Sequence, residues 1–154
     1  MVCPVPGLDV TTELRVALFF ALHTFSVEGE DLVCRRTPPG SGDCVVYCLV
    51  VAEPEWAIDY ERLVPTLTTA ARPRAQRARF LANAWRYARN GSARNIYCAF
   101  YLSPDVDWGE DVPSYREMFP SPDLFGDWLT HVQRCDVGSE AAALLAGYRR
   151  VVSA

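Results

Sequence analysis

Seven arginines and no acidic residue fall between positions 72 and 94. They are Arg72, Arg74, Arg77, Arg79, Arg86, Arg89 and Arg94. A helix over 72–89 would place Arg79, Arg86 and Arg89 on one side and leave an apolar stripe that includes Trp85 on another. Arginine pairs bidentately with carboxylates and phosphates and stacks on aromatic rings. The segment therefore predicts a face that recognises an acidic protein or a polyanion.

Three interpretations of this arginine segment stay open. The arginines can form a solvated face that pairs with the chain's own carboxylates, an arrangement that contributes little free energy. They can dock an acidic protein partner. They can also contact nucleic acid, with Trp85 and Tyr87 stacking on bases. The net charge of -4 disfavours nucleic acid, because the rest of the chain would repel a polyanion.

A second cluster of charge is acidic and lies in a loop. Its four carboxylates come from Asp105, Asp107, Glu110 and Asp111, with Trp108 among them. The spacing does not fit a calcium-binding EF-hand loop. With Asp105 as position 1, the expected glycine is Glu110 and the expected closing glutamate is Arg116. We therefore predict no metal site and expect this loop to contact a partner or the chain's own arginine segment.

Catalytic motifs give little support for an enzyme. The chain has no nucleophile elbow, H-E-x-x-H motif, Walker loop or dinucleotide-binding glycine motif. A thiol-histidine centre would need His23 or His131 beside one of the six cysteines, and spacing places no such pair in contact. The catalytic residues of a small thiol- or histidine-dependent enzyme, the alternative function, thus stay unknown, and no cofactor is expected.

The cysteines predict a reduced compartment. They are Cys3, Cys34, Cys44, Cys48, Cys98 and Cys135, with no C-x-x-C pair. We expect buried free thiols, while a disulfide framework stays open because the count is even. The apolar run 16–22 lacks a basic segment before it and a cleavage site after it, so no signal peptide is expected. The predicted location is intracellular, in the cytoplasm or, for a viral protein, also the host nucleus.

Hydrophobic periodicity and turn residues predict an α+β fold. Strands are expected at 31–36, 44–52 and 95–102, a loop at 103–113 and a helical turn at 114–119. Helices are expected from Thr11 or Thr12 to about Thr24, at 53–63, 72–89, 121–135 and 139–148. The strand at 44–52 is apolar on both faces, which predicts a central position. We expect one domain over residues 1–154, with a small sheet of about three strands packed against four to five helices.

Composition completes the functional prediction. Half of the 154 residues are hydrophobic, with no apolar run long enough for a membrane span. All 15 basic residues are arginine, which GC-rich coding explains and which also removes every side-chain ubiquitination site. Aromatics and arginine are enriched at interface hot spots. A core made partly of aromatics explains most of the same residues equally well. These aromatics are Trp56, Tyr60, Trp85, Tyr87, Trp108, Tyr115 and Trp128. We predict a non-catalytic protein-protein interaction module, either a viral host-modulating adaptor or a bacterial partner-neutralising protein. Its expected binding residues are Arg79, Trp85, Arg86, Arg89, Asp105, Asp107, Trp108, Glu110 and Asp111.

Overall fold

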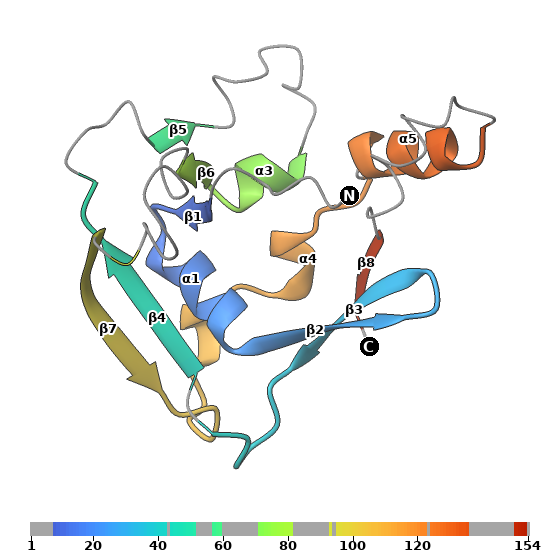
Figure 1. Cartoon of the computed structure of the whole chain (residues 1–154). Helices are drawn as coiled ribbons and strands as arrows, with labels where there is room; N and C mark the ends of the chain where they lie inside the picture. The colour runs from blue at the N-terminus through green and yellow to red at the C-terminus, as the bar shows by residue number, and fades with distance from the viewer. Residues whose placement is uncertain are drawn as a thin grey trace.

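Helix α1 (Leu14–Ala21) contacts one strand in each of three small sheets in the computed structural model of the chain (Figure 1). These strands are β1 (Leu8–Thr11) in the first sheet, β2 (His23–Glu28) in the second and β4 (Cys44–Leu49) in the third. The structure describes residues 8–42, 44–51, 57–59, 71–81, 93, 95–122, 124–135 and 150–153. Within those residues, α1 is the element that the three sheets share.

The first sheet is antiparallel and joins segments far apart in the sequence. Its order is β1-β6-β5, with β1 at Leu8–Thr11, β6 at Ala78–Leu81 and β5 at Ala57–Asp59. The central strand, β6, pairs Phe80 with Asp9 on one side and with Ile58 on the other. The Thr11 hydroxyl donates to the Gln76 carbonyl at 2.9 Å, which ties the end of β1 to the chain just before β6.

The second sheet is a hairpin with an added parallel strand. Strands β2 (His23–Glu28) and β3 (Asp31–Arg36) pair antiparallel, and β8 (Arg150–Ser153) pairs parallel to β3. Gly29 closes the hairpin with φ of 61°, a left-handed conformation that glycine adopts without steric cost. The parallel pairing brings the C-terminal part of the chain against the N-terminal hairpin.

The third sheet consists of β4 (Cys44–Leu49) and β7 (Ile96–Leu102), paired antiparallel. Cys44 lies opposite Leu102 at one end, and Leu49 lies opposite Ile96 at the other. The register shifts between Cys48 and Leu49, which is a β-bulge.

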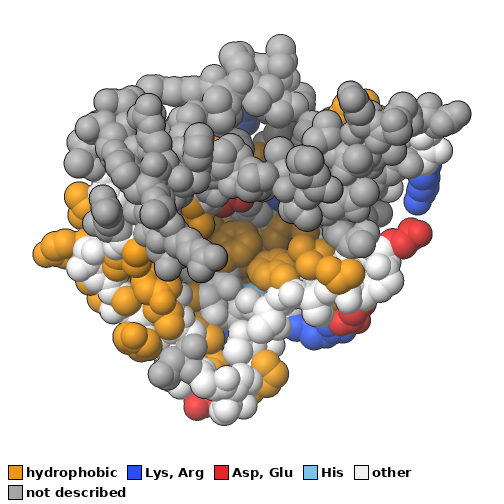
Figure 2. Space-filling view, viewed as in Figure 1, with side chains coloured by type: hydrophobic (Ala, Val, Ile, Leu, Met, Phe, Trp, Pro, Cys, Tyr) orange, Lys and Arg blue, Asp and Glu red, His pale blue; other side chains and the backbone are white. Residues whose placement is uncertain are grey.

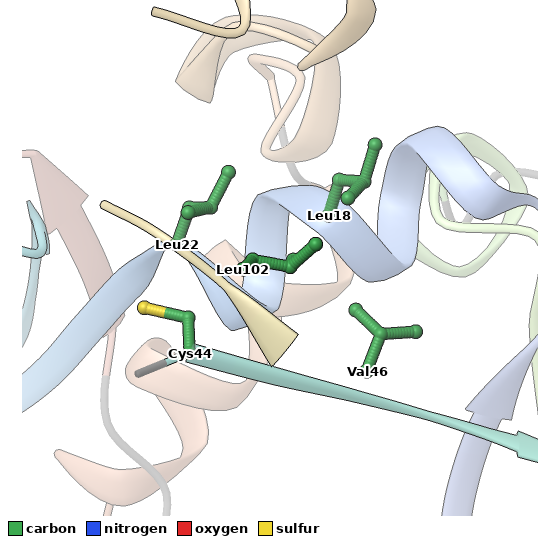
Figure 3. Packing of buried hydrophobic residues seen from close by; sticks show 5 residues of the cluster. All are labelled: Leu18, Leu22, Cys44, Val46 and Leu102. Atoms are coloured by element: carbon green, nitrogen blue, oxygen red, sulfur yellow. The ribbon is translucent and has the colours of Figure 1, made fainter. Parts of the chain in front are cut away.

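The core forms two clusters because α1 presents different side chains to different neighbours. Leu18 and Leu22 pack with Cys44, Val46 and Leu102 of the third sheet, as Figure 3 shows. A second cluster joins Val16, Phe19, Cys34 and Met118, and so connects α1 with β3 and α4 (Tyr115–Met118). Positions 18 and 22 lie one turn apart on the helix, which aligns them on one face.

Helix α4 begins with a capping box. The Ser114 hydroxyl accepts from the Glu117 backbone N–H, and the Glu117 carboxylate accepts from the Ser114 backbone N–H at 2.7 Å. The Ser114 hydroxyl also donates to this carboxylate, at 2.8 Å. The bond from the Ser114 backbone N–H, and then the bond from its hydroxyl, hold the pKa of Glu117 below its ordinary value. The cap orients a helix that carries the buried Met118 and Tyr115, whose hydroxyl donates to the Val151 carbonyl at 2.7 Å.

Replacing Ser114 with alanine is expected to lower the free energy of unfolding by about 1 kcal/mol, because α4 loses an N-cap acceptor. Chemical denaturation measures the change. Ser41→Ala is a matched control at an exposed turn position, expected to stay within about 0.5 kcal/mol of the parent. Equal effects of the two substitutions would contradict a stabilising role for the cap.

The fold-class prediction of one sheet against four to five helices is wrong. The described chain instead has three separate sheets, and its α-helices are α1, α3 (Ala71–Ala75), α4 and α5 (Leu124–Gln133), with a 3-10 turn at η4 (Gly109–Asp111). The predicted helix to Thr24 ends at Ala21, because residues from His23 onward pair with β3. The prediction of a single domain is a separate matter and stays a prediction.

The predicted helix at 72–89 is found only as far as Ala75, and the predicted helix at 53–63 is wrong at 57–59, the part of it that the structure describes. Helix α3 ends at Ala75, Arg77 takes a positive φ of 44°, and Ala78–Leu81 continues as strand β6. Ala57–Asp59 is strand β5. Pairing with β1 and β5 therefore overrides the helix propensity of alanine and arginine. The predicted helix at 139–148 lies outside the described residues.

The predicted strands at 31–36, 44–52 and 95–102 are confirmed as β3, β4 and β7. The loop, the helical turn and the helix that follow them are found as well, with α5 covering most of 121–135. The expectation that 44–52 is central and covered on both faces is wrong, because one face of β4 is exposed. Among the described helices, none combines the length and apolarity needed to cross a membrane.

Candidate interaction surface

The outer face of the β4–β7 sheet is lined by tyrosines. Tyr97 and Tyr101 alternate along β7, and the register places Ala99 opposite Tyr47 and Tyr101 opposite Val45. Side chains alternate between the faces of a strand, so these five residues share one face, here called the tyrosine face. Tyr97 is 79% exposed, Tyr101 71% and Tyr47 58%. Figure 2 shows hydrophobic side chains gathered over β4 and β7.

The opposite face of the same sheet explains this exposure. Cys44, Val46 and Leu102 are buried there against α1 (Figure 3). Because a change of register by one residue would expose those core residues, the tyrosines are held toward solvent. Val50 and Val106 are exposed as well, and so are Ile96 and Phe100, which alternate with the tyrosines of β7 and lie on its other face.

The acidic loop leaves the sheet at Leu102, next to Tyr101, and its first two carboxylates are bound within the protein. Asp105 accepts from the Gly40 backbone N–H at 2.9 Å and so joins this loop to the one before β4. Asp107 accepts from the Gly109 backbone N–H at 2.9 Å, where Gly109 has a positive φ. These two predicted binding residues thus shape the loop.

The other two acids of the loop present their charges differently. Arg15 of α1 donates to the backbone carbonyls of Glu110, at 2.7 Å, and Asp111, at 3.4 Å. Both residues are exposed. Arg15 therefore fixes the backbone of η4, while the Glu110 and Asp111 carboxylates stay at the surface.

Trp108, the predicted aromatic of this loop, belongs partly to the core. Its indole N–H donates to the Ser103 carbonyl at 3.2 Å, and its ring packs against the cluster around Leu18 and Leu22. The side chain is half-buried, which leaves it less exposed than the three tyrosines. Trp108 fastens the acidic loop to α1.

The arginine face can be followed only at its start. Arg79 lies in strand β6, opposite Val10 and Asp59, so the helical spacing that grouped it with Arg86 and Arg89 does not hold there. Trp85, Arg86 and Arg89 lie outside the described residues. Arg72 places its guanidinium 5.4 Å from the Phe119 ring centre, a cation-π contact within the protein.

His23 is held by the end of α1. Its ring stacks on Phe19 at 4.0 Å between centroids, and Nδ1 lies 2.7 Å from the Phe19 carbonyl. A carbonyl only accepts, so Nδ1 carries the proton and donates. Burial lowers the pKa of His23, the charge of Arg36 across the hairpin lowers it further, and the bond to Phe19 opposes both.

Stability is expected to fall on mild acidification because of His23. The pKa is lower in the folded protein than in the unfolded chain, so protonation below about pH 6.5 favours unfolding. The contribution of neutral His23 to the free energy of unfolding is complete above that pH. It is lost as the pH falls toward the folded-state pKa. Urea unfolding between about pH 8 and about pH 5.5 measures the effect. His23→Gln should flatten the slope and the exposed His131→Gln should keep it; an unchanged slope in His23→Gln would refute the assignment.

Neither histidine meets a thiol through its ring in the contacts that the structure gives. The Cys135 thiol donates to the backbone carbonyl of His131 at 3.4 Å. In the searched, described part of the chain, no three His, Cys, Asp or Glu residues converge to hold a metal ion. Cys34, Cys44, Cys48, Cys98 and Cys135 are all free thiols.

Comparisons with protein-family models, curated proteins and solved structures found no significant match. The candidate surface therefore rests on the geometry of the structure alone.

Tyr47, Tyr97 and Tyr101 were not identified from the sequence as surface residues, although tyrosine at alternate positions of a predicted strand was a visible signal. Tyr115, which was considered for the interface, instead stacks on Phe119 at 5.0 Å between ring centres.

Proposed function

We propose that the protein is a non-catalytic protein-protein interaction module that binds its partner through the tyrosine face and the exposed carboxylates of Glu110 and Asp111. The observation that carries this proposal is the exposure of Tyr47, Tyr97 and Tyr101 on a sheet whose other face is core. Exposed aromatic groups of this kind are typical of binding sites rather than of inert surface.

Tyrosine suits a protein partner for physical reasons. It combines a large apolar ring with a hydroxyl that can hydrogen-bond, and only two side-chain torsions become ordered on binding. Such residues dominate the energy of many interfaces. A two-stranded sheet packed on α1 holds the rings in place, which lowers the entropy cost of association.

The charges of the protein indicate which kind of partner would bind. Glu110 and Asp111 are exposed carboxylates in the loop that Arg15 of α1 holds, and the chain as a whole carries -4. An apolar patch bordered by basic side chains would complement this arrangement. A phosphate backbone would be repelled by the same carboxylates, so a protein partner is favoured over nucleic acid. The lysine-free composition further suits an adaptor that works beside a host ubiquitin ligase.

Site-specific photocrosslinking tests the proposed surface. A benzophenone amino acid is introduced separately at Tyr97, at Tyr101 and at Val27, a control on strand β2 that is 60% exposed. After irradiation in lysate of the source or host cell, one discrete protein adduct is expected from both tyrosine positions and not from Val27. Identical adducts from all three positions, or none from the tyrosines, would overturn the proposal.

A further inference from the structure

Cys48 and Cys98 lie directly opposite each other across strands β4 and β7. Both are free thiols and both are partly exposed. Directly opposed residues of paired strands project to the same side of a sheet, so both thiols lie on one face. This face is the one opposite the tyrosine face, because Cys98 and Tyr97 are consecutive residues of one strand.

The spacing of such a pair suits a disulfide. Directly opposed residues of an antiparallel pair have Cα atoms about 4.5–5.5 Å apart, and disulfides span about 4.4–6.8 Å between Cα atoms. The bond can thus form with the strands paired as they are. The other described cysteines are placed differently: Cys44 lies opposite Leu102, Cys34 is buried in the second cluster, and Cys135 lies at the end of α5.

The pair lies at the open end of the sheet's inner face. The next pair on this face toward the core consists of Val46, which is buried, and Phe100, which is 51% exposed. On the other side of the cysteine pair, the bulge after Cys48 ends the regular register of the two strands. Bulges are common next to functional sites. A small reagent can therefore reach the two thiols without opening the cluster around Leu18.

We propose that Cys48 and Cys98 form a redox-active dithiol that closes to an intramolecular disulfide by exchange with a low-molecular-weight disulfide such as oxidised glutathione. One cysteine, as thiolate, attacks the glutathione disulfide, forming a mixed disulfide and releasing one glutathione thiolate. The second cysteine attacks the protein sulfur of that mixed disulfide and releases the second. Overall, two protein thiols lose two electrons and two protons, and one oxidised glutathione becomes two reduced molecules.

Either thiol can make the first attack, and the thiol opposite it then resolves the mixed disulfide. Desolvation raises the pKa of Cys98, and the Cys48 side chain opposite it raises that pKa further. The second step is intramolecular, which gives the pair a high effective concentration that a single thiol lacks. This inference does not depend on the proposed function.

The test uses the unmodified protein in glutathione buffers of graded redox ratio. After acid quenching and alkylation, peptide mass spectrometry should find Cys48 and Cys98 losing their free thiols together, in one cross-linked product lighter by two hydrogens. Cys135, an exposed thiol without a partner cysteine across from it, should instead carry bound glutathione. Reduced dithiothreitol should restore all of these thiols.

Two variants check the intramolecular second step. In Cys98→Ser, the glutathione adduct of Cys48 should accumulate to several times its level in the parent protein, because no second thiol resolves it. Cys135→Ser should leave the Cys48–Cys98 product unchanged. The proposal is overturned if the two thiols are oxidised in unequal proportion, if either pairs with another cysteine, or if both stay reduced while Cys135 is modified.

Discussion

Replacing Phe19 with alanine is expected to lower the free energy of unfolding by about 4 kcal/mol. The ring is fully buried and packs against Val16, Cys34 and Met118. It also stacks on His23, so its removal leaves a cavity where α1, the hairpin and α4 meet. Urea denaturation followed by circular dichroism measures the loss.

Leu14→Ala provides a control in the same helix. Leu14 is 61% exposed, and alanine favours helix, so this change is expected to stay within about 0.5 kcal/mol of the parent. Because α1 contacts all three sheets, Phe19→Ala should shift one common transition rather than melt one sheet alone. Similar losses for Leu14→Ala and Phe19→Ala would contradict the role of α1 as the shared core element.

The double substitution of Tyr97 and Tyr101 by serine is expected to raise the Kd for the partner identified by photocrosslinking by about a hundredfold. Each change removes an exposed ring from the tyrosine face and leaves Cys44, Val46 and Leu102 packed against α1. Calorimetry or surface plasmon resonance measures the affinity. The thermal midpoint should change little, because neither ring belongs to the core.

Val27→Ser is the matched control for this double variant. Val27 is an exposed strand residue in a different sheet, so its loss should leave the affinity unchanged. Tyr101→Phe should keep most of the binding if the ring area is what matters. A double serine variant that binds as tightly as the parent would remove the tyrosine face from the interface.

The strands with strong local signals could be predicted from sequence. Residues 44–52 and 95–102 are rich in β-branched and aromatic residues and are bounded by turn residues, which is sufficient to identify β4 and β7. Helix α4 was visible through Ser114 and Glu117, whose spacing is that of a capping box. In each case the information lies within about ten residues.

The strands that could not be predicted depend on pairing with segments far away in the sequence. Strands β1, β6 and β8 have four residues each, and β6 lies in an alanine- and arginine-rich segment that favours helix. Strand β6 forms because β1 and β5 pair with it, and β8 pairs with β3 from the far end of the chain. The hairpin of β2 and β3 did carry a local signal, Gly29 between two strand-like runs, which a helix extended to Thr24 obscured.

The candidate surface was predictable only in part. The acidic loop was visible, but its anchoring by Gly40 and Arg15 depends on residues 65 or more positions away. The tyrosine face could not be assigned because both sides of β4 and β7 are apolar in sequence. Only the packing of Leu18 and Leu22 decides which side is core.

The most direct test of the binding surface is fluorine NMR of the protein labelled with fluorotyrosine. Spectra are recorded with and without the partner protein that photocrosslinking identifies. The chain has seven tyrosines, which single Tyr→Phe substitutions assign. The resonances of Tyr47, Tyr97 and Tyr101 are expected to shift on binding, while that of Tyr115, packed on Phe119, stays in place. Binding that leaves Tyr97 and Tyr101 unshifted would contradict the proposed interface.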